Sequence, residues 1–246
     1  MLACKTPKLE APELGRCFAC LIRERGICGA LSEQQLLKFK HIARHRTYRP
    51  GERILSSENA ADFLGAINSG VVKVTKILAD GRQQIVGLLF PPNCVGHTYG
   101  TTNAYFVEAA TPVELCCFER GGFDRLSAEY PGLSRHLLDQ TLKELESAQD
   151  WMVLLGRKTA EEKVASLLLM LATRAAPSHD CNGYKAPRVA EFELHLKRDE
   201  IADFLGLTYE TVCRQIAALK KRDIVRFSGT RRFSVPDLEP LATLAG

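Results

Sequence analysis

Hydrophobic and polar positions divide the chain into a β-rich part and a set of helical segments. Between Thr47 and Glu119, short apolar runs such as Gln84-Ile85-Val86-Gly87-Leu88-Leu89 are separated by glycine-containing turns. Short β-rich runs punctuated by tight turns are typical of a compact all-β roll. Asp80-Gly81 is the strongest hairpin signal in this region. We therefore predict a β-roll here.

A long helix is predicted after the roll, from about Leu133 to Leu155. Its apolar residues recur at steps of three and four over more than two heptads, which favours a coiled-coil seam. The alternative is that this face packs only on the helix's own roll. We predict a homodimer interface formed by Leu138, Leu142, Leu145, Ala148, Met152 and Leu155.

The C-terminal part of the chain has the pattern of a helix-turn-helix. Arg198 to Leu205 is predicted as a first helix, and Gly206 stands at a tight turn. Thr208 is placed to cap a second helix that runs to about Arg222. Two later runs, Ile224 to Phe227 and Arg232 to Val235, are predicted to form a hairpin, so the motif is expected to be winged.

The second helix of this motif carries residues suited to reading DNA. Glu210 and Arg214 are four apart and so share a face, where they could also form a simple ion pair. Arginine can reach guanine O6 and N7, and glutamate can accept from cytosine N4. Arg222 adds charge for phosphates. We predict that DNA is contacted by Thr208, Glu210, Thr211, Cys213, Arg214, Lys220, Lys221 and Arg231.

Composition adds limits on the class of protein. The 246 residues suffice for two modest domains, and the net charge of +4 permits a nucleic-acid partner without demanding one. Nine cysteines, an odd count, argue against a secreted disulfide framework. The sequence shows no signal peptide and no apolar run long enough to span a membrane. We expect a cytoplasmic protein without a membrane partner.

Three cysteines lie close together near the N-terminus, in Cys17-Phe18-Ala19-Cys20 and, after seven further residues, at Cys28. In a chain expected to keep its thiols reduced, such a cluster indicates a metal ion or an iron–sulfur cluster. Zinc suits a set of four cysteines equally well on ligand count. The residue pattern alone leaves the metal open.

A roll, a long helix and a winged helix-turn-helix, in that order, resemble the CRP/FNR superfamily of transcription regulators. The segment Leu205 to Arg214 closely matches the recognition segment of that family. The resemblance implies an α+β fold with an N-terminal β-roll of the cyclic-nucleotide-binding type, a long dimerisation helix and a C-terminal winged helix-turn-helix. The domains are then expected at 1–30 (cysteine-rich cluster-binding segment), 31–128 (sensor roll), 129–156 (dimerisation helix) and 157–246 (DNA-binding domain).

One part of the roll departs from the cyclic-nucleotide branch of this family. That branch carries a Gly-Glu phosphate-binding stretch followed by an Arg-Ser or Arg-Thr pair. The corresponding region here, Val95 to Phe106, contains neither glutamate nor arginine. We therefore expect no cyclic nucleotide as ligand.

The N-terminal cysteines instead resemble the oxygen-sensing, FNR-like (FnrN/FixK-type) branch. There, three N-terminal cysteines and one in the roll hold an oxygen-labile 4Fe–4S cluster. Cys17, Cys20 and Cys28 correspond to the first three, although the gap before Cys28 is longer than in the best-known pattern. Alignment favours Cys116 as the fourth ligand over its neighbour Cys117. Strand alternation agrees, because Cys117 shares a face with Val113 and Leu115.

The resemblance implies an oxygen- or redox-responsive transcription regulator that binds a TTGA-type palindrome as a dimer while its cluster is intact. RNA polymerase would be a further partner. One alternative is a zinc or thiol-based redox regulator of the same fold, and Cys213, where the family usually has serine, could add a thiol switch. Another is a cluster-dependent enzyme. The six histidines show no metal-binding spacing, and no nucleophile elbow or phosphate-binding loop is present, so no enzyme is expected.

Overall fold

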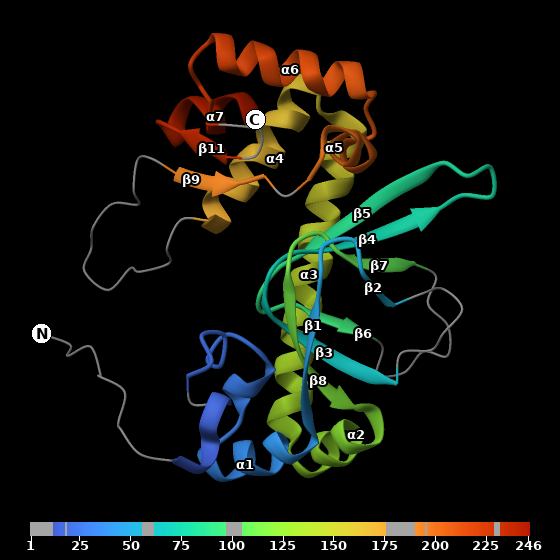
Figure 1. Cartoon of the computed structure of the whole chain (residues 1–246), viewed down its shortest axis with the longest axis vertical. Coiled ribbons are helices and arrows are strands. Elements are labelled where there is room, and N and C mark those ends of the chain that lie inside the picture. The colour runs from blue at the N-terminus through green and yellow to red at the C-terminus, as the bar shows by residue number, and fades with distance from the viewer. Residues whose placement is uncertain are drawn as a thin grey trace, which may run out of the picture. The chain divides into compact units, whose positions relative to one another are not determined.

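The computed structural model describes residues 12–17, 19–55, 62–96, 105–175, 190–194, 196–228 and 232–246. Contacts divide the chain into two compact units, one within Pro7–Ser147 and one within Ala148–Gly246. Among the described helices, none combines the length and apolarity that a membrane span requires. In chain order (Figure 1), the N-terminal unit begins with η1 (Pro12–Cys17), η2 (Ile27–Ala30), α1 (Glu33–Ile42), β1 (Ala43–Tyr48), β2 (Arg53–Leu55), β3 (Phe63–Ser69), β4 (Val72–Ile77), β5 (Gln83–Leu89), β6 (Cys94–Gly96), β7 (Phe106–Ala109), β8 (Val113–Glu119) and α2 (Arg120–Glu129).

The remaining elements begin with a long helix that runs from the first unit into the second. They are α3 (Pro131–Arg157), α4 (Ala160–Ala175), β9 (Ala190–Glu193), α5 (Arg198–Leu205), α6 (Tyr209–Lys221), β10 (Arg226–Ser228), β11 (Arg232–Val235) and α7 (Leu238–Ala245). The boundary between the two units falls within α3, after Ser147.

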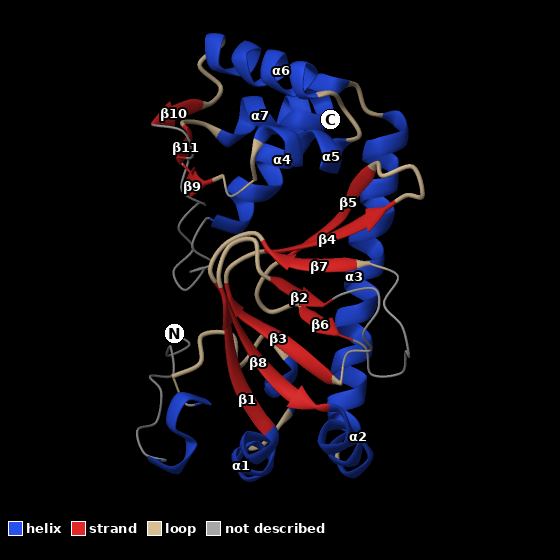
Figure 2. Ribbon diagram, turned by 45° about the vertical axis from the view of Figure 1, so that its right-hand side comes forward, coloured by secondary structure: helices blue, strands red, loops and turns tan. Residues whose placement is uncertain are grey.

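The predicted β-roll is confirmed, and it consists of two four-stranded antiparallel sheets. Their strand orders are β1-β8-β3-β6 and β2-β7-β4-β5, and both sheets are visible in Figure 2. The predicted hairpin at Asp80-Gly81 joins β4 to β5, and Gly81 has a φ of 85°, which glycine adopts without strain. Ile67, Val72 and Leu115 are fully buried between the sheets. Their burial supplies the hydrophobic stabilisation of the roll.

A second core lies under α1 and α2, which sit beside each other at one end of the roll (Figure 2). Phe39 of α1 contacts Phe118 of β8 with ring centroids 4.3 Å apart, and Phe123 of α2 lies 6.0 Å from Phe39. Ser32 begins α1 with a capping box that it completes with Gln35. This core extends into the N-terminal segment that carries the cysteines.

The predicted long helix is present as α3, two residues longer at each end than expected. Along it, Leu138, Leu142, Leu145 and Met152 are 59, 50, 51 and 68% exposed. Exposed apolar residues repeated along one helix face are what an unpaired dimer seam would show. Ala148 is also exposed, whereas Leu155 is half-buried.

The second unit contains the predicted two-helix motif and hairpin, together with two elements that the sequence pattern did not predict, strand β9 and helix α7. The hairpin is β10 and β11, but β10 begins at Arg226, because Ile224 N donates to the Leu219 carbonyl at the end of α6 and so is not part of the sheet. A third strand, β9, pairs with β11 on its other side. The wing is therefore a three-stranded sheet of order β10-β11-β9.

Candidate metal centre and nucleic-acid interface

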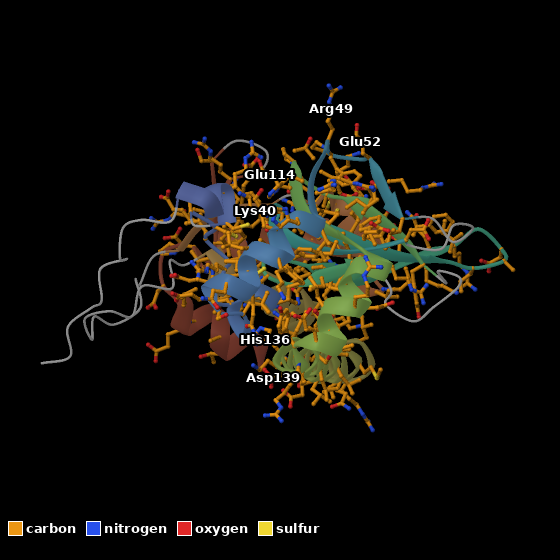
Figure 3. The ribbon with its side chains drawn as sticks, turned by 90° about the horizontal axis from the view of Figure 1, so that it is seen from below. Lys40, Arg49, Glu52, Glu114, His136 and Asp139 are labelled. Carbon is orange, nitrogen blue, oxygen red and sulfur yellow. The ribbon has the colours of Figure 1, made fainter. Side chains whose placement is uncertain are left out.

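The four cysteines predicted as ligands line one pocket of about 380 Å³ at the side of the roll. Cys17, Cys20 and Cys28 come from the N-terminal segment, and Cys116 comes from β8. Polar residues of the sheet line the same pocket. Figure 3 labels one of them, Glu114, together with Lys40 of α1, on the side of the roll where the N-terminal segment lies. Residues that are about ninety positions apart are thus brought together.

The chain between Cys20 and Cys28 is wound into tight turns that shorten the long gap. Arg23 N donates to the Cys20 carbonyl at 3.1 Å, and Gly29 N donates to the Gly26 carbonyl at 2.9 Å. A Cβ at position 29 would lie 2.4 Å from the Glu24 carbonyl oxygen, so the close winding there requires glycine. These turns return Cys28 to the same pocket as the first two cysteines.

Two isoleucines anchor the cysteine loop, which we define as residues 17 to 31. Ile22 and Ile27 are 6 and 1% exposed and belong to the core under α1 and α2. Burying such a side chain stabilises a fold by about 1.5–3 kcal/mol. The sequence pattern did not lead us to predict this anchor. The sequence feature that could have indicated this anchor is an apolar residue two positions after Cys20 and another immediately before Cys28.

Strand alternation separates the two adjacent cysteines of β8, as predicted. Cys117 is 2% exposed and packs between the sheets with Val113 and Leu115. Cys116 faces the other way and pairs in register with His45 of β1 and Ala66 of β3. All three of these residues line the pocket, whereas Cys117 does not. Cys116 is therefore the β8 thiol that shares the pocket with the N-terminal cysteines.

The electrostatics also show that the four thiols converge. Burial, together with smaller effects of Cys17 and Cys20, raises the pKa of Cys28 to about 12. Burial likewise raises the pKa of Cys116, with added effects from Cys28 and Cys17. Burial and Cys20 also raise the pKa of Cys17, and Lys40 and Arg23 offset part of this rise, because a nearby cation favours the thiolate. Forming the four thiolates therefore requires nearby positive charge to offset their negative charge, and a metal centre provides it.

The all-cysteine donor set of the pocket suits zinc as well as a 4Fe–4S cluster. Thiolates on one zinc ion lie at about 2.3 Å from the metal and so within about 4 Å of one another. In the described residues, no three His, Cys, Asp or Glu side chains are grouped closely enough to hold one ion. The seven cysteines described are free thiols. The pocket of about 380 Å³ has room for a multi-atom group, so the described residues fit a 4Fe–4S cluster.

In the second unit, α5 and α6 form the predicted helix-turn-helix. Gly206, with a φ of 61°, ends α5 in the left-handed conformation. The Thr208 hydroxyl accepts a hydrogen bond from Thr211 N at 3.3 Å and so begins α6. Ala202 and Val212 are buried where the helices meet. These contacts fix the orientation of α6 relative to α5.

The outer face of α6 carries the residues predicted to read bases. Glu210 and Arg214 are exposed, and in the part of the chain that the structure describes they form no ion pair with each other. The simple ion-pair interpretation is therefore not supported. Thr208 is exposed beside them, while Thr211 and Cys213 are half-buried. The Tyr209 hydroxyl is hydrogen-bonded to the Cys213 thiol, which raises the pKa of Tyr209.

The cations predicted to contact phosphates differ in their surroundings. Lys220 and Lys221 are exposed at the end of α6. Arg222 is instead paired with Glu161 of α4 at 2.5 Å, so its charge is partly compensated within the protein. Arg231 lies outside the described residues. Arg198 lies over the Phe227 and Phe233 rings at 5.2 and 5.8 Å and so packs the wing against α5.

Replacing Gly206 by alanine tests the turn of the helix-turn-helix. We expect a loss of about 1–2 kcal/mol in the free energy of unfolding, because a non-glycine residue is strained at this positive φ. A Cβ there would only approach Leu155 at 4.0 Å, so the cost comes from the backbone and not from a clash. Denaturant unfolding followed by circular dichroism measures the loss. Gly121→Ala, where a Cβ meets open space and φ is ordinary, is the control.

Comparison with known proteins gives two domain matches. Residues 45–130 match the cyclic nucleotide-binding domain family, and residues 162–244 match the Crp-like helix-turn-helix domain family. The first match covers the roll. Most of the region in which we expected no nucleotide-binding residues, 97–104, lies outside the described residues.

Full-length relatives and a solved structure give the same picture. A probable transcriptional activator of Rhizobium leguminosarum is 44% identical over 92% of this chain and 91% of its own. The transcriptional activator protein FnrL of Cereibacter sphaeroides is 40% identical over 95% and 93%. The structure of FixK2 from Bradyrhizobium japonicum aligns with a TM-score of 0.73 at 31% identity, covering 83% of this chain and 98% of FixK2.

Proposed function

Because the chain belongs to the CRP/FNR family and is therefore a DNA-binding transcription regulator and not an enzyme, we propose that it senses oxygen through a 4Fe–4S cluster. The cluster would be held by Cys17, Cys20, Cys28 and Cys116. The observation that carries this proposal is the convergence of these four thiols on one pocket beside the roll. When bound, such a cluster would supply an oxygen-labile centre whose state the protein can read.

Residues of the cysteine loop would transmit the presence or loss of the cluster to the rest of the first unit. Ile22 and Ile27 anchor the cysteine loop in the core. The bound cluster would in addition link the thiols of the loop to Cys116 of the sheet. Lys40 and Arg23 offset part of the rise in the pKa of Cys17 that burial and Cys20 cause, and so reduce the cost of forming its thiolate. We propose that loss of this tie loosens the loop against the core on which the first half of α3 packs.

The DNA-binding half of the proposal rests on α6 and on dimerisation through α3. Two copies of α6 would read a palindrome of TTGA type, with Glu210 and Arg214 at the bases and Lys220 and Lys221 at the phosphates. Recognition helices of such dimers lie about 34–36 Å apart. As the relatives are transcriptional activators, RNA polymerase is the proposed downstream partner.

Leu142→Ala tests the proposed dimer seam. The side chain is 50% exposed in the single chain, so burial of that exposed part in each of two copies contributes about 2 kcal/mol per dimer. We expect the dimer dissociation constant to rise about 30-fold, measured by sedimentation under anaerobic conditions. Val86→Ala removes a comparably exposed apolar side chain from β5 and should leave dimerisation unchanged. An unchanged constant for Leu142→Ala would remove α3 from the interface.

Metal analysis of anaerobically purified protein tests the sensing half. The proposal predicts about four iron and four sulfide per protomer. About one zinc per protomer, without sulfide, would support the zinc regulator of the same fold instead.

A further inference from the structure

Helix α3 has two faces of different character in the first unit. Leu138, Leu142 and Leu145 are exposed on one face. His136, Gln140 and Glu144 follow one another at steps of four and therefore lie along the opposite face. Figure 3 views this helix nearly end-on, with His136 labelled on it. Leu133 and Leu137 on the same face pack on the core under α1 and α2, as expected of a core-facing helix, so the polar residues beside them need a specific explanation.

Gln140 connects α3 directly to the cysteine loop. Its Nε2 donates to the backbone carbonyl of Arg25 at 3.1 Å, across 115 residues of sequence. Arg25 stands between Cys20 and Cys28. Among the described residues, the Gln140 Oε1 is buried without a hydrogen-bond partner. A half-satisfied buried amide weakens a fold relative to an apolar residue, so simple stability does not explain glutamine here.

Glu144, one turn further along, connects the same face to the sheet. Its Oε1 accepts a hydrogen bond from Asn93 Nδ2 at 2.7 Å. Asn93 is itself fixed, because its Oδ1 accepts from Phe90 N at 3.1 Å and its carbonyl accepts from Ile67 N at 2.9 Å. Glu144 thus ties α3 to the rigid roll, whereas Gln140 ties it to the loop that bears the ligands.

We propose that Gln140 is the positioning residue that couples the cysteine loop to the dimer helix, with the Glu144–Asn93 hydrogen bond as the fixed point of α3. When the loop holds its place against Cys116, the Gln140 hydrogen bond keeps the first half of α3 in the dimer-forming position. When the loop loosens, the Gln140 hydrogen bond breaks while the Glu144 hydrogen bond remains. The inference rests on the proposed function and adds the regulatory connection.

The test separates cluster binding from its effect on dimerisation. Gln140→Met preserves length and apolar packing but removes the amide donor, and Lys143→Ala removes a 70% exposed side chain from the next turn as the control. For each variant, the dimer dissociation constant is measured by sedimentation before and after exposure to air, together with iron and sulfide content. The readout is the ratio of the two constants.

We expect Gln140→Met to bind iron and sulfide as the unmodified protein does, with the air-dependent ratio reduced about tenfold, since the variant removes two hydrogen bonds per dimer. Lys143→Ala should keep the full ratio. An unchanged ratio for Gln140→Met, or an equal reduction for Lys143→Ala, overturns the inference. If the unmodified protein contains no cluster, or if its dimer dissociation constant is the same before and after air, the proposed function itself is wrong. The coupling role of Gln140 is then wrong as well.

Discussion

We expect replacement of Cys116 by alanine to abolish cluster binding and high-affinity anaerobic DNA binding, and replacement of its neighbour Cys117 to preserve both. Only Cys116 lines the pocket with Cys17, Cys20 and Cys28, since Cys117 is buried between the sheets. Without Cys116, β8 supplies no thiol to the cluster, so the cluster no longer links the cysteine loop to the sheet. We expect anaerobic operator affinity to fall toward the non-specific level, by about 10³-fold or more.

Cys117→Ala is a stringent control because it removes the same atoms from the adjacent residue. It leaves a small cavity beside Val113 and Leu115, so its free energy of unfolding should fall while its iron and sulfide content stays unchanged. The measurements are metal content, the visible spectrum and operator titration by fluorescence anisotropy, all without air. Full iron in Cys116→Ala with loss in Cys117→Ala would reverse the assignment of the fourth ligand.

Replacing Arg214 by alanine has the second large effect, on DNA recognition without change at the cluster. Arg214 is exposed on α6 and has no ion pair with Glu210, so its guanidinium is available for bases. A bidentate contact to guanine contributes about 1–3 kcal/mol, and a palindrome uses it twice. We expect operator affinity to fall by about 2–6 kcal/mol, with discrimination relaxed at the guanine position.

The lysines at the end of α6 provide the contrast. Lys220→Ala and Lys221→Ala should weaken binding similarly on all sequences, and each phosphate contact removed should lower the dependence of log affinity on log salt by about one unit. Titrations of the TTGA palindrome and of a variant with the guanine replaced, each at several salt concentrations, distinguish the two classes. Equal losses on both operators for Arg214→Ala would exclude it from base reading.

Local sequence patterns were sufficient for the elements that carry the function. The period of two along β8 separated Cys116 from Cys117, because successive side chains of a strand face opposite sides. Gly206 and Thr208 located the turn and the start of α6, since their backbone roles are local. The heptad pattern located α3 to within two residues at each end.

Features that depend on long-range contacts were not predictable in the same way. The pairing of β9 with β11 joins segments about forty residues apart, and nothing in four residues of strand specifies the partner. The hydrogen bond of Gln140 to the Arg25 carbonyl depends on how the loop is wound, and a backbone acceptor leaves no trace in the sequence. The ion pair of Arg222 with Glu161 likewise depends on the packing of α4 against α6.

Recording cluster absorbance and operator binding on one sample shows whether one cysteine-held cluster controls DNA binding. A single anaerobic sample is titrated with the palindromic operator while its visible absorbance is followed, before and after air is admitted. If the cluster controls DNA binding, we expect iron–sulfur absorbance and tight binding before air is admitted, and loss of both together afterwards. A sample without that absorbance that binds the operator equally well before and after air would contradict it.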